Sequence, residues 1–403
     1  MNRIVCCVLT VLLGASLAGA SPPSEPSKGA DRLVVHEWGT FTSVSGAKGT
    51  ALEWRPLGGK DDLPSFVYSN VTRTTGQGLR FGEVCPGCDH PSCACGKNCA
   101  PVNGRCKCKG CVRSTVRMET PVIYFYTERE RKIRVKVGFP QGQITEWYPQ
   151  ARSVNEGIDW GTVLLRPGAK VTLPKEPGPS HYYPAREVDA VPVQVCGRDP
   201  AKKGPETERF LFYRGVGTFD LPLAARFRGK SDLELANFGK LPLQTLIVFE
   251  RKGDRVGVRV IQPKCSAGVA PRDTRRVALP LTSERTTFSA TAGVAKVRAV
   301  LEQLLVAEGL YAKEARAMVE TWADHWFEDG LRAFYLVPRE RTDELLPLTL
   351  DPKPDELVRV LVGRLEMITP ALRQRVRELA LGLVSEDPTR RAAAVAQFAR
   401  EGR

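Results

Sequence analysis

The sequence predicts an α+β fold, in which an antiparallel, β-rich, sandwich-like body is followed by a helical C-terminal region. Two observations lead to this prediction. From Leu33 to about Leu281, short runs of alternating apolar and polar residues are separated by turns rich in glycine and proline. Beyond residue 290, apolar residues recur at helical spacing instead. Strands that succeed one another without intervening helices favour antiparallel pairing over a parallel α/β sheet.

The body is expected to contain a series of short strands. They fall at residues 33–44, 116–126, 132–139, 143–148, 160–165, 208–213, 246–249 and 256–261. We expect 116–126 and 132–139 to pair through the charged turn between them. The clearest hairpin joins 246–249 to 256–261 around Gly253.

The C-terminal region begins with two expected helices. One has its apolar residues between 294 and 305 and ends at Gly309, and the other places Tyr311, Trp322 and Trp326 on one core-facing stripe. Strand-like runs follow at 331–337 and 357–368, although the second run also fits a helix. Two final helices are expected, the first with Thr369 as its N-cap. The predicted domains are therefore 33–290, which is β-rich, and 291–403, an α/β region that ends in helices.

The first twenty residues have the features of a secretory signal peptide. A basic start at Arg3 precedes an apolar run over residues 4–17, and small residues at 18–20 predict cleavage after Ala20. An uncleaved anchor is less well supported, because the run is shorter than the roughly 18–20 residues that span a bilayer. Residues 21–32 are rich in serine and proline and are expected to form a flexible linker. The mature protein is thus expected to be secreted or periplasmic, without a transmembrane span.

Eight cysteines form the most distinctive segment of the chain. They are Cys85, Cys88, Cys93, Cys95, Cys99, Cys106, Cys108 and Cys111, inside a predicted insertion at 83–112. The only larger aliphatic residue between them is Val102, so this segment has no hydrophobic core of its own. Cross-links or bound metal must therefore give it order.

Two interpretations of this segment stay open. The CxC and CxxC spacings place thiolates near enough to share zinc or another soft divalent metal, and eight sulfurs suffice for two tetrahedral sites. In this respect the segment resembles metallothionein-like sequences. An oxidising compartment instead favours four disulfides. The two remaining cysteines of the mature chain, Cys196 and Cys265, are expected to pair with each other.

His36, Glu119 and His181 are weak candidates for catalysis. The chain has only four histidines, and a ligand or base role for His36 would be shared with His181 or Glu119. The competing interpretation is that His36 is a partly buried histidine bonded to the backbone, and that His325, beside Asp324, is structural too. The sequence has no HExxH, GxSxG, P-loop or dinucleotide-binding motif.

Composition and charge exclude several classes of protein. With 42 % hydrophobic residues and one long apolar run, the chain is neither disordered throughout nor a multi-span membrane protein. The formal net charge of +14 is spread along the chain, without a basic stripe interleaved with aromatic residues, so no nucleic-acid partner is expected. Attraction to anionic envelope polymers is the more natural consequence for an exported protein.

Several motifs together resemble one family. The sequence His-Glu-Trp-Gly-Thr-Phe-Thr at 36–42 and the segments 117–126, 146–149 and 335–339 are similar to those of exported bacterial proteins of unknown function. The similarity extends from about residue 34 to residue 370. It implies export and one continuous architecture but no reaction, because that family has no assigned catalytic residues. The eight-cysteine insertion is not part of the resemblance.

These observations support one leading hypothesis and two alternatives. The leading hypothesis is a secreted or periplasmic, non-catalytic binding or envelope-associated protein with a disulfide- or metal-stabilised insertion. The first alternative is an extracellular, metal-assisted hydrolase that uses His36, Glu119 or His181. The second alternative is sequestration of metal by the cysteine segment. No motif identifies a substrate or ligand.

Overall fold

The computed structural model describes residues 32–46, 48–57, 62–70, 112–196, 204–229, 231–262 and 269–401. The predicted signal peptide at 1–20, the linker up to residue 31 and the eight-cysteine segment lie outside these residues, as does Cys265. The interpretations of these segments therefore stay predictions. Cys196 is exposed and forms no disulfide within the described part of the chain.

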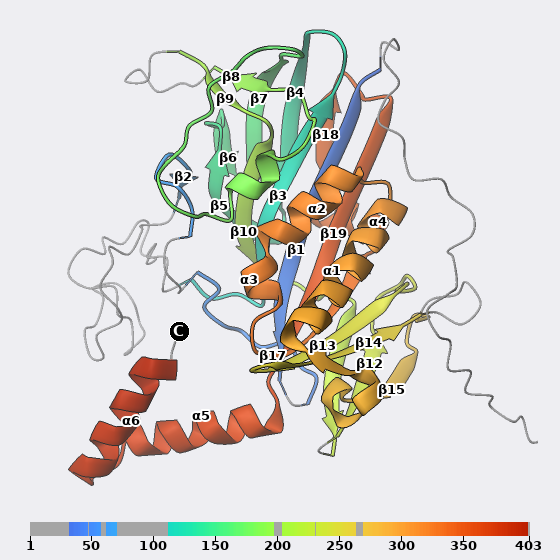
Figure 1. The fold of residues 1–403 in the computed structure, drawn as a ribbon. Coiled ribbons are helices and arrows are strands. Elements are labelled where there is room, and N and C mark those ends of the chain that lie inside the picture. The colour runs from blue at the N-terminus through green and yellow to red at the C-terminus, as the bar shows by residue number, and fades with distance from the viewer. Residues whose placement is uncertain are drawn as a thin grey trace, which may run out of the picture.

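The centre of the fold is one ten-stranded sheet (Figure 1). Its strands, in spatial order, are β16 (Thr287–Ser289), β14 (Arg255–Ile261), β13 (Leu246–Lys252), β17 (Gly330–Val337), β19 (Glu356–Met367), β1 (Val34–Ser45), β3 (Val116–Tyr126), β10 (Leu211–Gly217), β5 (Gly142–Tyr148) and β2 (Tyr68–Ser69). Adjacent strands are antiparallel, except that β1 runs parallel to β19. Strands on both sides of residue 290 therefore pair within the same sheet.

Two smaller sheets pack against one face of the large sheet. One contains β18 (Leu348–Asp351), β4 (Arg131–Gly138), β7 (Gly157–Leu165), β8 (Val193–Val195) and β9 (Glu206–Glu208), with β6 (Ser153–Asn155) beside β7; the other contains β11 (Leu223–Arg228), β12 (Asp232–Asn237) and β15 (Thr274–Ala278). Side chains from all three sheets, such as Phe125, Val135 and Leu233, share one hydrophobic core. The predicted α+β class with a β-rich body is confirmed.

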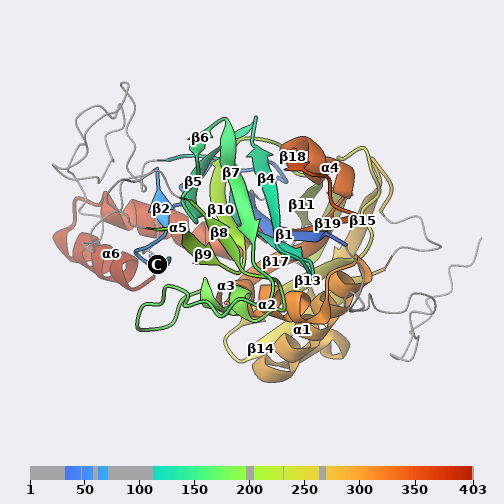
Figure 2. The same ribbon diagram turned by 90° about the horizontal axis from the view of Figure 1, so that it is seen from above.

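Helices cover the opposite face of the large sheet (Figures 1 and 2). They are α1 (Ala290–Ala307), α2 (Ala312–Thr321), α3 (Ala323–Trp326) and the 3₁₀ helix η2 (Tyr183–Arg186), whereas α4 (Arg339–Leu345) contributes Leu345 to the other core. The second core includes Trp38, Tyr124 and Phe334 from the sheet. Trp322 and Trp326 are buried in it, as their helical spacing predicted.

Several local predictions are confirmed. β13 and β14 form the expected antiparallel hairpin, with Gly253 at a φ of +57° in the turn. Two helices end the described chain, α5 (Pro370–Leu383) and α6 (Pro388–Glu401). Thr369 is the N-cap of α5, because its side chain accepts a hydrogen bond from the backbone N–H of Leu372 at 3.1 Å. Among the described residues, no helix is long and apolar enough to cross a membrane.

Two local predictions are wrong. The strands at 116–126 and 132–139 do not pair: β3 joins the large sheet, while β4 joins the outer sheet. β3 is buried on both faces and therefore lies in the centre of the molecule. Every second residue of β4 is exposed, so β4 lies in an outer sheet with one face toward solvent. The single helix expected from Tyr311 to Trp326 is broken at Trp322 into α2 and α3. The ambiguous run at 357–368 is the strand β19, which is buried on both faces.

Candidate functional site

His36 is part of the core between the large sheet and α2. Its side chain is fully buried, and its Nδ1 lies 2.7 Å from Oε2 of Glu314. The ring also contacts those of Tyr126 and Tyr311. The partner of His36 is therefore a helix carboxylate rather than the backbone, and its neighbours are those of a structural residue.

Glu37 points to the other face of the sheet. It accepts a hydrogen bond from the hydroxyl of Tyr213 at 2.5 Å and forms an ion pair with Arg359. The β-bulge opposite Gly39 comes after this pair of residues, so His36 and Glu37 keep the opposite orientations expected of neighbours in a strand.

Glu119 belongs to a buried ionic network at the other end of β1 and β3. Its carboxylate accepts a hydrogen bond from Thr42 at 3.0 Å and lies 3.4 Å from Arg117 and 3.9 Å from Arg364. These contacts include neither His36 nor His181. The three candidates singled out from the sequence therefore lie in three separate environments.

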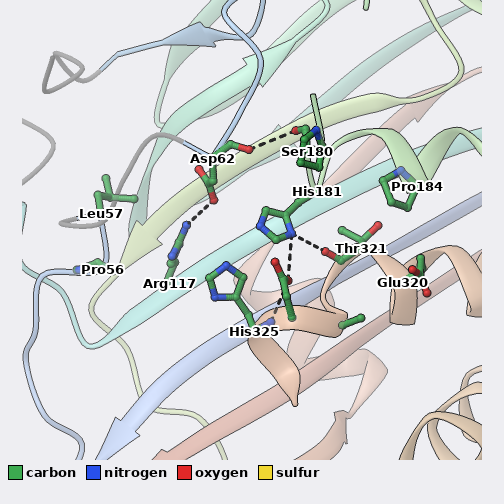
Figure 3. A pocket seen from close by; sticks show the side chains of 13 residues that line it. Pro56, Leu57, Asp62, Arg117, Ser180, His181, Pro184, Glu320, Thr321 and His325 are labelled. Atoms are coloured by element: carbon green, nitrogen blue, oxygen red, sulfur yellow. Dashed lines mark hydrogen bonds and ion pairs between the residues drawn. The ribbon is translucent and has the colours of Figure 1, made fainter. Parts of the chain in front are cut away.

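His181 instead meets Asp324 and His325 at the surface. Figure 3 shows the rings of His181 and His325 beside each other. The potential ligand atoms of these three side chains all lie within 4.8 Å of one another. Nδ1 of His181 is 3.3 Å from Oδ1 of Asp324, and the centroids of the two histidine rings are 4.9 Å apart. Within the described residues this is the one group of three histidine, cysteine or acidic side chains that could bind a metal.

The break between α2 and α3 fixes the tautomer of His181. In a continuous helix the carbonyl of Thr321 would accept the N–H of His325, four residues later. At the break, the N–H of His325 bonds to the carbonyl of Trp322 instead. The carbonyl of Thr321 then accepts Nδ1–H of His181 at 2.9 Å. The lone pair of His181 is consequently on Nε2, the form in which a histidine binds a metal while a backbone carbonyl orients its ring.

The loop that contains His181 is anchored by its neighbour Tyr182. This side chain is buried, and its hydroxyl donates to Glu208 at 3.1 Å. Arg186 forms charge-assisted hydrogen bonds to the same carboxylate at 2.6 to 3.2 Å. Burial and the charge of Glu208 raise the pKa of Tyr182 well above its ordinary value, so the hydroxyl stays protonated as a donor. Trp322 stacks on the ring of His181, with centroids 5.7 Å apart.

The three side chains form part of the wall of a cavity of about 600 Å³. Asp62 and Arg117 line the opposite wall (Figure 3). Asp62 accepts two hydrogen bonds from the buried Arg214, at 2.7 and 2.9 Å, and one from Arg117 at 3.3 Å. The hydroxyl of Ser180 donates to the backbone carbonyl of Asp62 at 3.3 Å. The loop of His181 is thus tied to both walls of the cavity.

Two neutral imidazoles and a carboxylate are ligands that divalent transition metals such as zinc prefer. Three protein ligands beside a cavity would leave a coordination position for water or another small ligand. The sequence singled out His181 together with His36 and Glu119, which lie elsewhere in the structure, and favoured a structural role for His325, which stays a prediction. The available signal was the Asp324-His325 dipeptide, where two ligand types are adjacent; only the broken helix turns both towards His181.

No known protein family and no curated protein matches the sequence. Among solved structures, the yeast delta-COP-I mu-homology domain aligns with 84 % of this chain and 96 % of its own, at 7 % sequence identity and a TM-score of 0.24. So low a TM-score supports no statement about function. The resemblance to exported bacterial proteins stays a prediction.

Proposed function

We propose that this chain is an exported binding protein that takes up a divalent transition-metal ion at His181, Asp324 and His325. The sequence pattern of residues 1–20 supports export, and the HEWGTFT motif supports a place among uncharacterised exported bacterial proteins. The observation on which metal binding rests is the convergence of three ligand side chains within 4.8 Å. This set replaces His36, whose Nδ1 pairs with Glu314, and Glu119, whose carboxylate pairs with Thr42 and Arg117.

Two hydrogen bonds hold ligand side chains of this set in place. Nδ1–H of His181 is used by the backbone, so Nε2 presents its lone pair. Oδ1 of Asp324 accepts the N–H of His325 at 2.9 Å, which fixes the carboxylate relative to that ring. Ligands held in place before the metal arrives lose little conformational entropy on binding.

The eight-cysteine segment requires a separate test, because its thiolates would also bind zinc or a similar metal. We propose that it is stabilised by disulfides or by such a metal, and that sequestration of metal by this segment, if it occurs, is independent of the pocket. Counting free thiols in the purified protein, together with its metal content, distinguishes the two. Eight free thiols without metal would contradict both.

Cobalt titration of protein whose free thiols are alkylated tests the pocket site. Cobalt thiolates absorb strongly in the near ultraviolet, whereas cobalt bound by histidine and carboxylate shows only weak visible bands, so the two sites are separated by spectrum. We expect one equivalent of cobalt to bind the alkylated protein. His181→Ala and His325→Ala are each expected to weaken binding at least about tenfold, which corresponds to about 1.4 kcal/mol.

Asp324 and Asp329 provide a matched pair for this experiment. Both are exposed to the same extent, 67 % and 66 % of the side chain, and both follow the end of α2 at Thr321. Asp324→Asn should weaken cobalt binding, and Asp329→Asn should leave it unchanged. Equal affinity of both variants, or no cobalt bound after alkylation, would contradict the proposal.

Metal-assisted hydrolysis is a second candidate, favoured by the combination of three ligands and an adjacent cavity of about 600 Å³. In such an enzyme the metal would activate a water molecule, and His181, Asp324 and His325 would hold the metal in place. Zinc-loaded protein should then hydrolyse a chromogenic ester or phosphoester faster than His325→Ala loaded in the same way. Equal rates would leave binding alone as the function.

A further inference from the structure

Helices α5 and α6 form a hairpin that projects from the end of the large sheet (Figures 1 and 2). The two helices pack on each other: a Cβ added to Gly382 of α5 would lie 2.7 Å from Cβ of Ala394 in α6. The body does not cover the first part of α5, because every residue from 371 to 378 is exposed. The hairpin therefore presents most of α5 to its surroundings.

The exposed apolar side chains of the protein are concentrated on this hairpin. Within the described residues, six large apolar side chains are exposed, and five of them belong to α5, its C-cap or α6. These five are Leu372, Val376, Leu381, Val384 and Val395. Leu372 and Val376 are four residues apart, so they lie on one face of α5. Exposed apolar side chains gathered on one hairpin are typical of an interaction surface.

Arginines border this face of α5 on both sides. At about 100° per residue, Arg373 and Arg377 lie to one side of Leu372 and Val376, and Arg375 lies to the other. Glu378 is the only acidic residue of α5. An amphipathic helix with arginines beside an apolar face is typical of helices that lie in the interface of a bilayer, where the long side chains reach the headgroups.

We propose that the apolar face of α5, bordered by Arg373, Arg375 and Arg377, binds the surface of a bilayer that contains anionic lipids. The positive charge of these three arginines favours a lipid surface over a second copy of the chain as the binding partner. In a symmetric pair, the same face would meet itself, and the two sets of arginines would repel each other. A surface of phosphate headgroups attracts the arginines while its acyl region accepts Leu372 and Val376. This surface is independent of the proposed metal site.

Vesicle flotation with the full-length mature chain tests the proposal. The protein is mixed with vesicles of phosphatidylcholine alone or of phosphatidylcholine with phosphatidylglycerol. We expect binding only to the anionic vesicles and weaker binding as salt is added. Replacing all three arginines, in Arg373→Gln/Arg375→Gln/Arg377→Gln, should lower the partition coefficient about a hundredfold, since each arginine near an anionic surface contributes several-fold. Leu372→Ser/Val376→Ser should also reduce binding.

A matched variant separates this surface from the general positive charge of the protein. Lys132, Arg134 and Lys136 are three exposed cations on one face of β4, and replacing all three with Gln removes the same charge. This control should bind anionic vesicles like the unchanged protein.

Three outcomes would overturn the proposal: equal loss in both triple variants, equal binding to neutral vesicles, or a dimer in sedimentation that Leu372→Ser/Val376→Ser dissociates while vesicles stay unbound. All substituted residues are exposed, and an unchanged unfolding midpoint verifies that each variant folds.

Discussion

Glu314 of α2 accepts Nδ1–H of His36 from β1, and the two side chains are fully buried although they are 278 residues apart in the sequence. The same carboxylate accepts the hydroxyl of Tyr126 at 2.8 Å and the backbone N–H of Tyr311 at 2.7 Å. One buried carboxylate thus satisfies donors from two strands and from the start of its own helix. This geometry gives the histidine of the HEWGTFT motif a structural role.

Removing this acceptor should destabilise the protein strongly. In Glu314→Ala, three buried donors lose their partner at once, and we expect the free energy of unfolding to fall by about 3–5 kcal/mol. Urea denaturation followed by circular dichroism measures the change. Glu320→Ala is the matched control on the same helix, because Glu320 is half-exposed and pairs with Arg298 at the surface. It should cost less than about 1 kcal/mol. Equal costs for the two variants would contradict the structural role.

The sequence predicts that the neighbours His36 and Glu37 lie on opposite faces of their strand, but it does not predict the partner of either. Alternation along β1 places His36 and Glu37 on opposite faces, and the structure confirms this. The partner comes from α2, far along the chain, and no local pattern encodes such a pairing. The same limit applies to β19, whose parallel register with β1 joins Glu37 to Arg359 across 322 residues. Local periodicity predicts a strand but not its neighbour.

Arg359 has two carboxylate partners that differ in burial, and this difference predicts unequal costs. Glu37 is fully buried, whereas Asp343 is 46 % exposed. Glu37→Gln leaves the buried guanidinium with only the surface partner, and we expect a loss of about 3 kcal/mol in the free energy of unfolding. Asp343→Asn should cost less than about 1 kcal/mol, because water can replace the exposed carboxylate. Denaturant titration measures the free energy of unfolding of both variants. Similar losses would show that the burial of the carboxylate does not determine its contribution to stability.

Glu366 should make the stability of the protein depend on pH. Burial alone would raise the pKa of this carboxyl, but the guanidinium groups of Arg364 and Arg332, each 2.7 Å away, outweigh it and hold the pKa below 4.5. The unfolded chain therefore binds more protons in the acid range, so stability falls as pH falls through the folded-state pKa. Glu366→Gln should be less stable than the unchanged protein near neutral pH, and this difference should shrink below pH 4.5.

Unfolding in urea at a series of pH values measures this effect. Glu356 provides the control at the other end of β19, since it pairs with Arg32 at an exposed position. Glu356→Gln should show nearly the same pH profile as the unchanged protein. A constant difference between Glu366→Gln and the unchanged protein across the acid range would contradict the assignment.

The candidate metal site shows where inference from the sequence ends. Aromatic residues at helical spacing predicted that Trp322 and Trp326 are buried, and both are. The same spacing predicted one continuous helix, in which Asp324 and His325 would simply be surface residues. The break at Trp322 depends on packing against the sheet and on the loop of His181, neither of which leaves a local pattern. Two of the three histidines in the described part of the chain meet only because of it.

Gly363 is expected to tolerate no side chain, for a reason specific to its partner strand. It pairs with Tyr335 of β17, and a Cβ at this position would lie 2.1 Å from Cζ of that ring. Tyr335 is buried, so the ring cannot move into solvent. Gly363→Ala should therefore lower the free energy of unfolding by about 3 kcal/mol or abolish folding. Gly253→Ala, at a turn with a φ of +57° and nothing within 4 Å, should cost only about 1 kcal/mol.

Adding Tyr335→Leu to Gly363→Ala should recover stability by removing the clash, whereas Tyr335→Leu alone should destabilise. Additive losses in the double variant would show that this contact does not cause the effect.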